Sequence, residues 1–459
     1  MGDKTSARKH DLTEGPIFNK LVRLSMPIMA TSLMQTAHNL TNMFWLGRIE
    51  GDGSSYVAAA ALAGQFLWLS MALVLLCRVG VEIGVSQSMG KGDAESAKAF
   101  SQNGFALALG LGLAYALAVF AFRGRLIGFF NLDDEYVVRM ATEYLGVVAF
   151  SLPFMFAHFL FTGVYGGCGN TKLPFYINGA GIVLNIALNP LLVFGLGLGM
   201  HGAGASLVCA SAFNFGMKLW AMKLYKGRPF ADYSVFAGLS REKMRRILKW
   251  GVPVGLESFI FTGLFLVVSR LVSSEFGARA VSGHGVGIQV ESAAFMIAGG
   301  FGSALTAFIG QNYGAGKWGR IRATHRIATA AMAAYGFFIG AVLFAFAGPL
   351  ASAFLGGDPE AAAIGAGYLR IIALAQVLFC MEGVAVGSFR GQGLTLKPTV
   401  ASAASHALRV AATYALARTA LGINGVWAGI ALAMTFKSAW LLAWHRLYMR
   451  KMPTEDIQA

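Results

Sequence analysis

Several glutamates stand inside long apolar stretches of this sequence, where a charged side chain is unusual, and three of them lie in the second half of the chain. An ionisable side chain buried among apolar residues is costly, so it usually faces the interior of a helix bundle and is often functional. Burial raises the pKa of a carboxyl group and a neighbouring cation lowers it, so such a group can bind and release a proton near neutral pH. We therefore predict an ion-coupling role for Glu257, Glu291 and Glu382.

The first choice among the three is Glu257, because of the proline that precedes it. Pro253 lies one turn earlier on the same face of the expected helix, and a proline removes a backbone hydrogen bond and allows a bend. A change of helix shape linked to proton binding would be easiest at this point. The alternative is that Glu257 forms a permanent ion pair with Arg409 or Arg270.

Two stripes of mostly amide side chains run along the first half of the chain at helical spacing. Residues three and four apart lie on one face of a helix, so each stripe would point in one direction. The stripes would either hydrogen-bond each other as structural glue or line a cavity that binds substrate or a cation, and we expect the cavity. The first stripe consists of Gln35, His38, Asn39 and Asn42, and the second of Asn178, Asn185 and Asn189.

A third stripe lies in the second half and contains a cation. Its members are Ser402, Ser405, His406, Arg409 and Thr413. A buried guanidinium needs an acidic partner, because otherwise the loss of its hydration is not compensated. The three glutamates are the candidate partners. Like the amide stripes, His406 and Arg409 are predicted to line the cavity.

The segments that must position these residues are too apolar for a soluble protein. Of 459 residues, 56% are hydrophobic and only 13% are charged, against about 25% charged in soluble domains. A helix of about 20 apolar residues crosses the hydrocarbon core, and barrel strands would alternate in polarity, which these runs do not. The sequence predicts an all-α membrane protein. Twelve runs are long enough, near 17–46, 55–88, 98–121, 138–163, 174–198, 203–224, 247–272, 280–310, 325–348, 363–388, 398–420 and 425–447.

The net charge of +15 follows the predicted loops. Most of the 37 Lys and Arg residues fall in alternate turns, and the longest basic turn joins runs six and seven. Positive residues concentrate in cytoplasmic loops, so we expect an integral protein of the bacterial inner membrane with both termini in the cytoplasm. This distribution argues against a nucleic-acid surface.

The chain contains two repeats shifted by 223 to 226 residues. Pro27 corresponds to Pro253, and three further stretches match in the same order: "SQSMGKGDAESAK" with "GQNYGAGKWGRIR", "VYGGCGNTKLP" with "SFRGQGLTLKP", and "GMHGAGA" with "GINGVWA". Six helices per repeat is an even number, so the repeats are parallel, which predicts two pseudo-symmetric lobes around a central cavity. The predicted parts are an N-terminal segment 1–16, an N-lobe 17–224, a basic linker 225–245, a C-lobe 246–447 and a tail 448–459.

These motifs together resemble the multidrug and toxic compound extrusion family, in the superfamily that also holds flippases of lipid-linked oligosaccharides. The resemblance covers nearly the whole chain and includes "NLTNMFWLGR", the Gln-x-x-Gly-x-Gly turns, "LNIALNP" and "GINGVWAG". It implies export of organic, often cationic amphipathic compounds in exchange for protons or sodium ions, and the repeat symmetry predicts that the two lobes rock to give alternating access. Asn185 matches the family, but Asn42 and Asn189 stand where aspartates are usual. A protonation switch in the N-lobe therefore does not carry over.

Two other functions are weighed against export. A flippase for a lipid-linked oligosaccharide or another amphipathic anionic metabolite would need a basic cavity, for which Arg78, Arg270, Arg390 and Arg409 are available. Flippases of this kind commonly have fourteen helices, against the twelve predicted here, which argues against this function. The other function is that of an intramembrane enzyme. The chain lacks the H-E-x-x-H or G-x-S-x-G motif expected of one. We expect no enzyme activity, no cofactor beyond H⁺ or Na⁺, a monomer, and small organic compounds and membrane lipids as partners.

Overall fold

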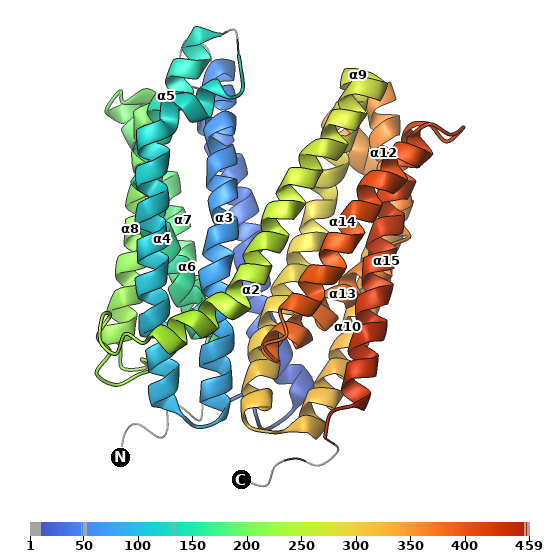
Figure 1. Cartoon of the computed structure of the whole chain (residues 1–459). Helices are drawn as coiled ribbons and strands as arrows, with labels where there is room; N and C mark the ends of the chain where they lie inside the picture. The colour runs from blue at the N-terminus through green and yellow to red at the C-terminus, as the bar shows by residue number, and fades with distance from the viewer. Residues whose placement is uncertain (1–10, 47, 49–52, 133, 454–455, 457–459) are drawn as a thin grey trace. The chain divides into compact units, whose positions relative to one another are not determined.

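The computed structural model describes residues 11–46, 48, 53–132, 134–453 and 456. At residues 36–40, 42–44, 53–54 and 265–266 it describes the backbone but not the side chains. Helices dominate this part of the chain, and no strand is assigned within it. They are α2 (Ile17–Leu46), α3 (Gly53–Gly90), α4 (Ala94–Gly128), α5 (Glu135–Ala149), α6 (Leu152–Gly167), α7 (Lys172–Pro190) with the π-helical turn η1 (Leu191–Gly195), α8 (Gly199–Lys223), α9 (Arg241–Gly314), α10 (Trp318–Ala345), α11 (Ala347–Leu355), α12 (Pro359–Ala373), α13 (Gln376–Gly391), α14 (Leu396–Ala417) and α15 (Ile423–Arg450) (Figure 1). The predicted all-α class is confirmed.

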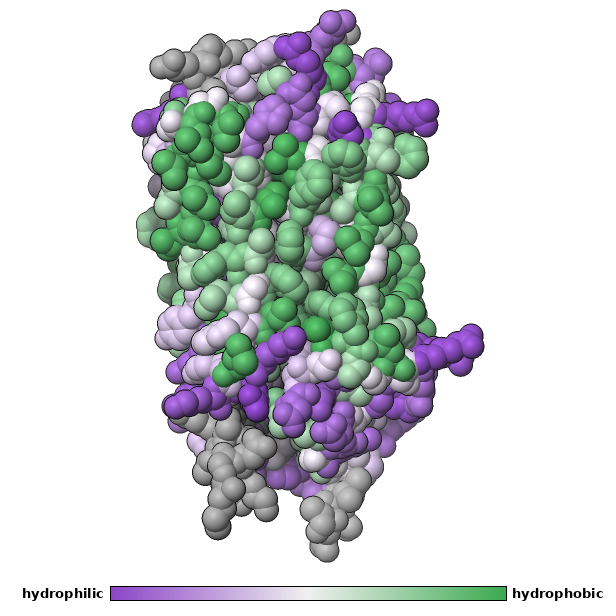
Figure 2. Space-filling model, turned by 90° about the vertical axis from the view of Figure 1, so that its left-hand side faces the viewer, coloured by the Kyte–Doolittle hydropathy of each residue, from purple (hydrophilic) through white to green (hydrophobic). Residues whose placement is uncertain are grey.

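Each of the twelve predicted runs is helical, but their number of membrane crossings stays a prediction. Among the described residues, six helices are long and apolar enough to cross a membrane, or eight if each of two bent helix pairs counts as one span. Figure 2 shows hydrophobic side chains gathered in a broad middle band on the face that it draws, with hydrophilic side chains at both ends. This distribution suits a protein whose middle is surrounded by lipid.

The two bent pairs occupy equivalent places in the two repeats. The axes of α5 and α6 differ by 51° across residues 150–151, and those of α12 and α13 differ by 56° across residues 374–375. These breaks are 224 residues apart, which is the shift of the repeat. Predicted runs seven and eight lie in one long helix, α9. Its backbone departs from helical geometry at Gly277 (φ 76°).

The described chain forms two compact units. The first contains residues 30–255 and the second contains residues 13–29 and 256–459. This division differs from the predicted boundaries, which placed all of the first helix in the N-lobe. In the first unit, α3, α4, α6 and α8 pack around a core that includes Phe105, Phe161 and Tyr165. In the second unit, Tyr368 and Trp427 lie in a core formed by α9, α12 and α15.

The predicted linker packs against the first unit through three consecutive polar residues of α4. Ser101 Oγ lies 2.8 Å from Tyr233 Oη, and Gln102 Nε2 donates to Ser234 O at 2.7 Å. Asn103 accepts from the amide of Ser240 at 2.7 Å and donates to a backbone carbonyl at 3.0 Å. Burial raises the pKa of Tyr233 above its usual range, so its hydroxyl stays protonated. The segment before α9 is therefore held by specific contacts.

Glycines bring the start of α9 against α3 within the first unit. A Cβ at Gly80 would lie 2.4 Å from the carbonyl oxygen of Ile247, and a Cβ at Gly251 would lie 1.8 Å from that of Leu76. Neither position tolerates a side chain without separating the two helix backbones. By contrast, a Cβ at Gly64 in α3 meets nothing within 4 Å.

We expect Gly251→Ala to destabilise the protein and its matched control Gly64→Ala to leave stability unchanged or slightly raised. The new methyl group at position 251 would collide with backbone, and overpacking of this kind costs about 1–3 kcal/mol or more. Alanine at position 64 gains up to about 1 kcal/mol of helix propensity. Thermal unfolding of the detergent-purified variants measures both changes, and equal midpoints for the two variants would contradict this packing.

Candidate ion-coupling site

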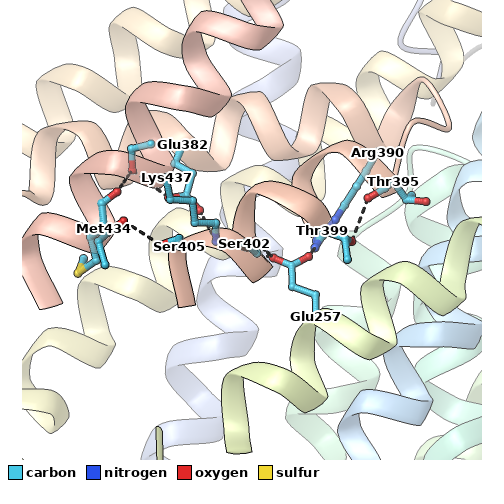
Figure 3. Close-up of polar contacts among 11 residues, drawn as sticks. Glu257, Glu382, Arg390, Thr395, Thr399, Ser402, Ser405, Met434 and Lys437 are labelled. Atoms are coloured by element: carbon cyan, nitrogen blue, oxygen red, sulfur yellow. Dashed lines mark hydrogen bonds and ion pairs between the residues drawn. The ribbon is translucent and has the colours of Figure 1, made fainter. Parts of the chain in front are cut away.

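Four charged side chains of the second unit form a row of alternating sign (Figure 3). Arg390 Nη2 lies 3.1 Å from Glu257 Oε2. Lys437 Nζ lies 3.7 Å from Glu257 Oε1 and 2.8 Å from Glu382 Oε1. The order Arg390, Glu257, Lys437, Glu382 places each carboxylate beside a cation, so the row carries no net charge when all four groups are ionised.

The row is mostly shielded from solvent, with exposed side-chain fractions of 17% for Lys437 and 24% for Arg390, and its carboxylates are also hydrogen-bonded. The exposed fraction of the side chain is 13% for Glu257 and 8% for Glu382. Ser402 Oγ donates to Glu257 Oε1 at 2.5 Å, and Ser438 Oγ donates to Glu382 Oε2 at 2.9 Å. Every carboxylate oxygen therefore has a charged or hydroxyl partner, which is the condition under which buried ion pairs are tolerated.

Helix spacing and small residues bring these groups together. Glu382 and Arg390 are eight residues apart on α13, so two turns place them on the same side of the helix. Between them, a Cβ at Gly387 would lie 2.4 Å from the carbonyl oxygen of Gly302 on α9. The close approach of α13 to the part of α9 that follows Gly277 thus depends on the missing side chain at Gly387.

The helices that complete the row are equally close. A Cβ at Gly429 on α15 would lie 2.7 Å from the amide nitrogen of Thr413 on α14. This contact seats α15, which carries Lys437 and Ser438, against α14, which carries Ser402. Four helices therefore contribute to the site, namely α9, α13, α14 and α15.

The structure corrects the partners that the sequence suggested. Glu257 pairs with Arg390 and Lys437, and the alternative of a pair with Arg270 or Arg409 is wrong. Arg409 makes no ion pair within the described part of the chain, although the charges of Glu291 and Glu382 act on it.

Glu291 lies outside the row. It accepts hydrogen bonds from Tyr368 Oη at 2.5 Å and from Gln376 Nε2 at 3.2 Å. His406, predicted to line the cavity, is buried, and its ring centroid lies 5.7 Å from that of Phe261. Its cavity role stays a prediction, like that of Arg409.

In the first unit, the amide residues of α7 contact α8. Asn178 Oδ1 accepts from Lys218 Nζ at 2.7 Å, and Asn185 Nδ2 donates to Ser206 Oγ at 3.2 Å. Asn189 is buried and Gln35 is half-buried. The remaining members of the helix-one stripe, His38, Asn39 and Asn42, have side chains outside the described part. Whether either stripe lines a cavity stays a prediction.

Two lysines of these networks were missed by sequence reasoning. Lys218 and Lys437 are each the single charged residue in the middle of a long apolar run, in "NFGMKLWAM" and "AMTFKSAWL". The cost of burying a charge that singled out the glutamates applies equally to these lysines. This cost could therefore have identified both lysines from the sequence. Within the described residues, no three His, Cys, Asp or Glu side chains gather in a way that could hold a metal ion.

One known family matches each of the two repeats separately. The model of the MatE family matches residues 27–191 and again residues 253–415. The chain belongs to the MatE family. The two matches begin at the corresponding residues Pro27 and Pro253, so the predicted repeat is confirmed.

Named relatives and solved structures agree with this assignment. The chain is 25% identical over 92% of its length to a probable multidrug resistance protein NorM of Thermotoga maritima, 90% of which is covered. It is 27% identical over 96% of its length to the probable multidrug resistance protein YpnP of Bacillus subtilis, 97% of which is covered.

Two solved structures share the fold. One is a MATE protein in the bent conformation, with a TM-score of 0.89 and 21% identity over 97% of this chain and 98% of that chain. The other is an MOP superfamily transporter of Pyrococcus furiosus, with a TM-score of 0.88 and 20% identity over 96% of this chain and 98% of that chain. The structural likeness extends over both units of this MatE chain.

Removing Lys437 should destabilise the protein strongly. Lys437→Met leaves Glu382 without its ion-pair partner, and breaking a buried pair from one side costs about 3–5 kcal/mol. The double variant Lys437→Met/Glu382→Gln should recover part of this loss, because no unpaired carboxylate remains. Thermal unfolding of the detergent-purified variants measures the cycle.

The control for this cycle is Glu360→Gln. Glu360 pairs with Arg279, and both side chains are more than 60% exposed, so the change should cost less than about 1 kcal/mol. A Lys437→Met variant as stable as Glu360→Gln would contradict the assignment of a buried, mutually dependent row.

Proposed function

We propose that this MatE protein is a secondary antiporter that exports organic, often cationic amphipathic compounds by alternating access in exchange for protons or sodium ions. The observation that carries the proposal is the row of four alternating charges around Glu257 inside the second unit. The names of the relatives as multidrug resistance proteins support small organic compounds as substrates. We place the protein in the bacterial inner membrane as a monomer with both termini in the cytoplasm.

A proton taken up by Glu257 would change the balance of the whole row. Protonation neutralises the carboxylate that holds Arg390 and Lys437, so the row gains a net positive charge. Lys437 would then be held by Glu382 alone. A cationic substrate nearby would be repelled and released, and loss of the proton to the cytoplasm would restore the neutral row. Proton entry is thereby exchanged for substrate exit.

Glu257 is placed where this change can alter helix shape. It follows Pro253 by one turn within α9, and a proline inside a helix leaves the backbone free to bend. Its partners lie on α13, α14 and α15. Protonation of this one carboxylate therefore weakens contacts with three other helices. The ammonium of Lys437 already occupies the space between the two carboxylates, which favours a proton over a sodium ion.

A flippase for an amphipathic anionic compound remains the second candidate. It would use free arginines to bind phosphate groups. Arg390, one of the four considered, is neutralised by Glu257, which leaves fewer cations for that purpose. This contact favours export of cations over flipping of anions.

Transport into proteoliposomes tests the proposal. We expect uptake of a cationic dye to follow an imposed proton gradient, to be indifferent to a sodium gradient, and to fall at least tenfold in Glu257→Gln. The exposed control Glu360→Gln should transport like the parent. Uptake that ignores both gradients would reject antiport, and an unimpaired Glu257→Gln would reject the site. Movement of a labelled lipid-linked sugar without any gradient would identify a flippase instead.

A further inference from the structure

A buried lysine occupies the first unit with only neutral partners. Lys218 on α8 is 0% exposed. Its Nζ donates to Asn178 Oδ1 at 2.7 Å, to Thr162 Oγ1 at 2.8 Å and to the backbone carbonyl of His158 at 3.2 Å. It also lies 3.3 Å from Nδ1 of the His158 ring.

No carboxylate is among the hydrogen-bond or ion-pair partners of Lys218 in the described part of the chain. A buried ammonium without a counter-ion is costly even when its protons are hydrogen-bonded. The charged group that acts on both Lys218 and His158 is Arg78 of α3, which has the same sign as the ammonium. Glu82, one turn after Arg78, approaches Gly166 on α6, two turns from His158. The site is therefore rich in basic groups.

The repeat gives this site a counterpart in the second unit. With a shift of 224 residues, His158 corresponds to Glu382 and Asn178 corresponds to Ser402. In the last helix of each repeat, where Gly199 corresponds to Gly422, the shift is 223, so Lys218 would fall at position 441, four residues after Lys437. Each unit thus places a lysine beside the first of these positions, Lys218 beside His158 and Lys437 beside Glu382. The second unit supplies carboxylates to its lysine, whereas the first unit supplies a histidine ring.

We propose that Lys218 and His158 form a second proton-exchange site, in which the two bases share one proton. In one form the proton is bonded to Lys218 Nζ and His158 Nδ1 accepts the hydrogen bond. In the other, that N–H bond is broken, a new one joins the proton to Nδ1, and the imidazolium can release a proton from either ring nitrogen. Because protein acceptors already surround the fully buried Nζ, a proton is the ligand that the site has room to bind and release.

The role of this site in transport rests on the proposed antiport, but its titration does not. Export in a proton antiporter needs groups that change protonation between the two membrane faces. The first unit has asparagines at positions 42 and 189, and the Lys218–His158 pair places a titratable centre in that unit. The histidine is the group that distinguishes exchange from simple structural pairing, because it competes with the lysine for the proton.

Nitrogen NMR of protein labelled with ¹⁵N at the lysine side chains tests the inference without substrate or gradient. The Lys218 signal is assigned by its loss in Lys218→Met. We expect it to change from ammonium to amine at a lower pH than the signals of exposed lysines, which remain ammonium up to about pH 10. His158→Gln should move the midpoint by at least one pH unit, and Lys223→Met, a change at an exposed lysine of the same helix, should not move it.

A Lys218 signal that changes only together with those of the exposed lysines, or that does not change with pH, would overturn the inference, as would a midpoint unchanged in His158→Gln. The thermal midpoint of each variant shows that it is folded. Failure of dye transport in the parent would reject antiport and leave this titration in place, so the two proposals fail separately.

Discussion

A charge inside a membrane-spanning helix must find its partner within the protein, because lipid offers neither hydrogen bonds nor counter-ions. In the second unit this constraint is met by the row Arg390, Glu257, Lys437 and Glu382, completed by two serine hydroxyls. Since the members come from separate helices, neutralising one carboxylate leaves cations on other helices uncompensated. A single proton can thus disturb contacts along several helices at once.

Much of the fold could be predicted because lipid imposes length and polarity on every segment. The apolar runs and the matched prolines at 27 and 253 were sufficient for the helices and the repeat. The bends at 150–151 and 374–375 were missed because apolar composition continues across them. The attachment of Tyr233 to Ser101 was also missed, because a hydrogen bond between residues 132 positions apart leaves no periodic signal.

The candidate site was predicted only in part. Burial cost pointed correctly to Glu257 and Glu382 as polar residues of the helix interior, and the structure brings both to Lys437. Their pairing could not be read from the chain, because it depends on how each helix is rotated about its axis. Arg409 was expected to pair with one of the glutamates for its chemistry alone, whereas it is Arg390 of α13 that reaches Glu257.

The two repeats have kept their helices and changed their chemistry. Equivalent positions hold Glu382 in one unit and His158 in the other, so one buried lysine is balanced by acids and the other is surrounded by neutral acceptors. Proton coupling in this MatE chain would then be carried by two different kinds of site, with the carboxylates of the second unit as the principal one.

Infrared difference spectroscopy on substrate binding tests this central claim most directly, because a protonated carboxyl group has its own C=O stretching band. In the substrate-free protein the carboxylate of Glu257 is paired with Arg390 and Lys437, so the account predicts that such a band forms on acidification, that a bound cationic substrate suppresses it, and that Glu257→Gln lacks it. A difference spectrum without any carboxylic acid band, or one that is the same in Glu257→Gln, would contradict it.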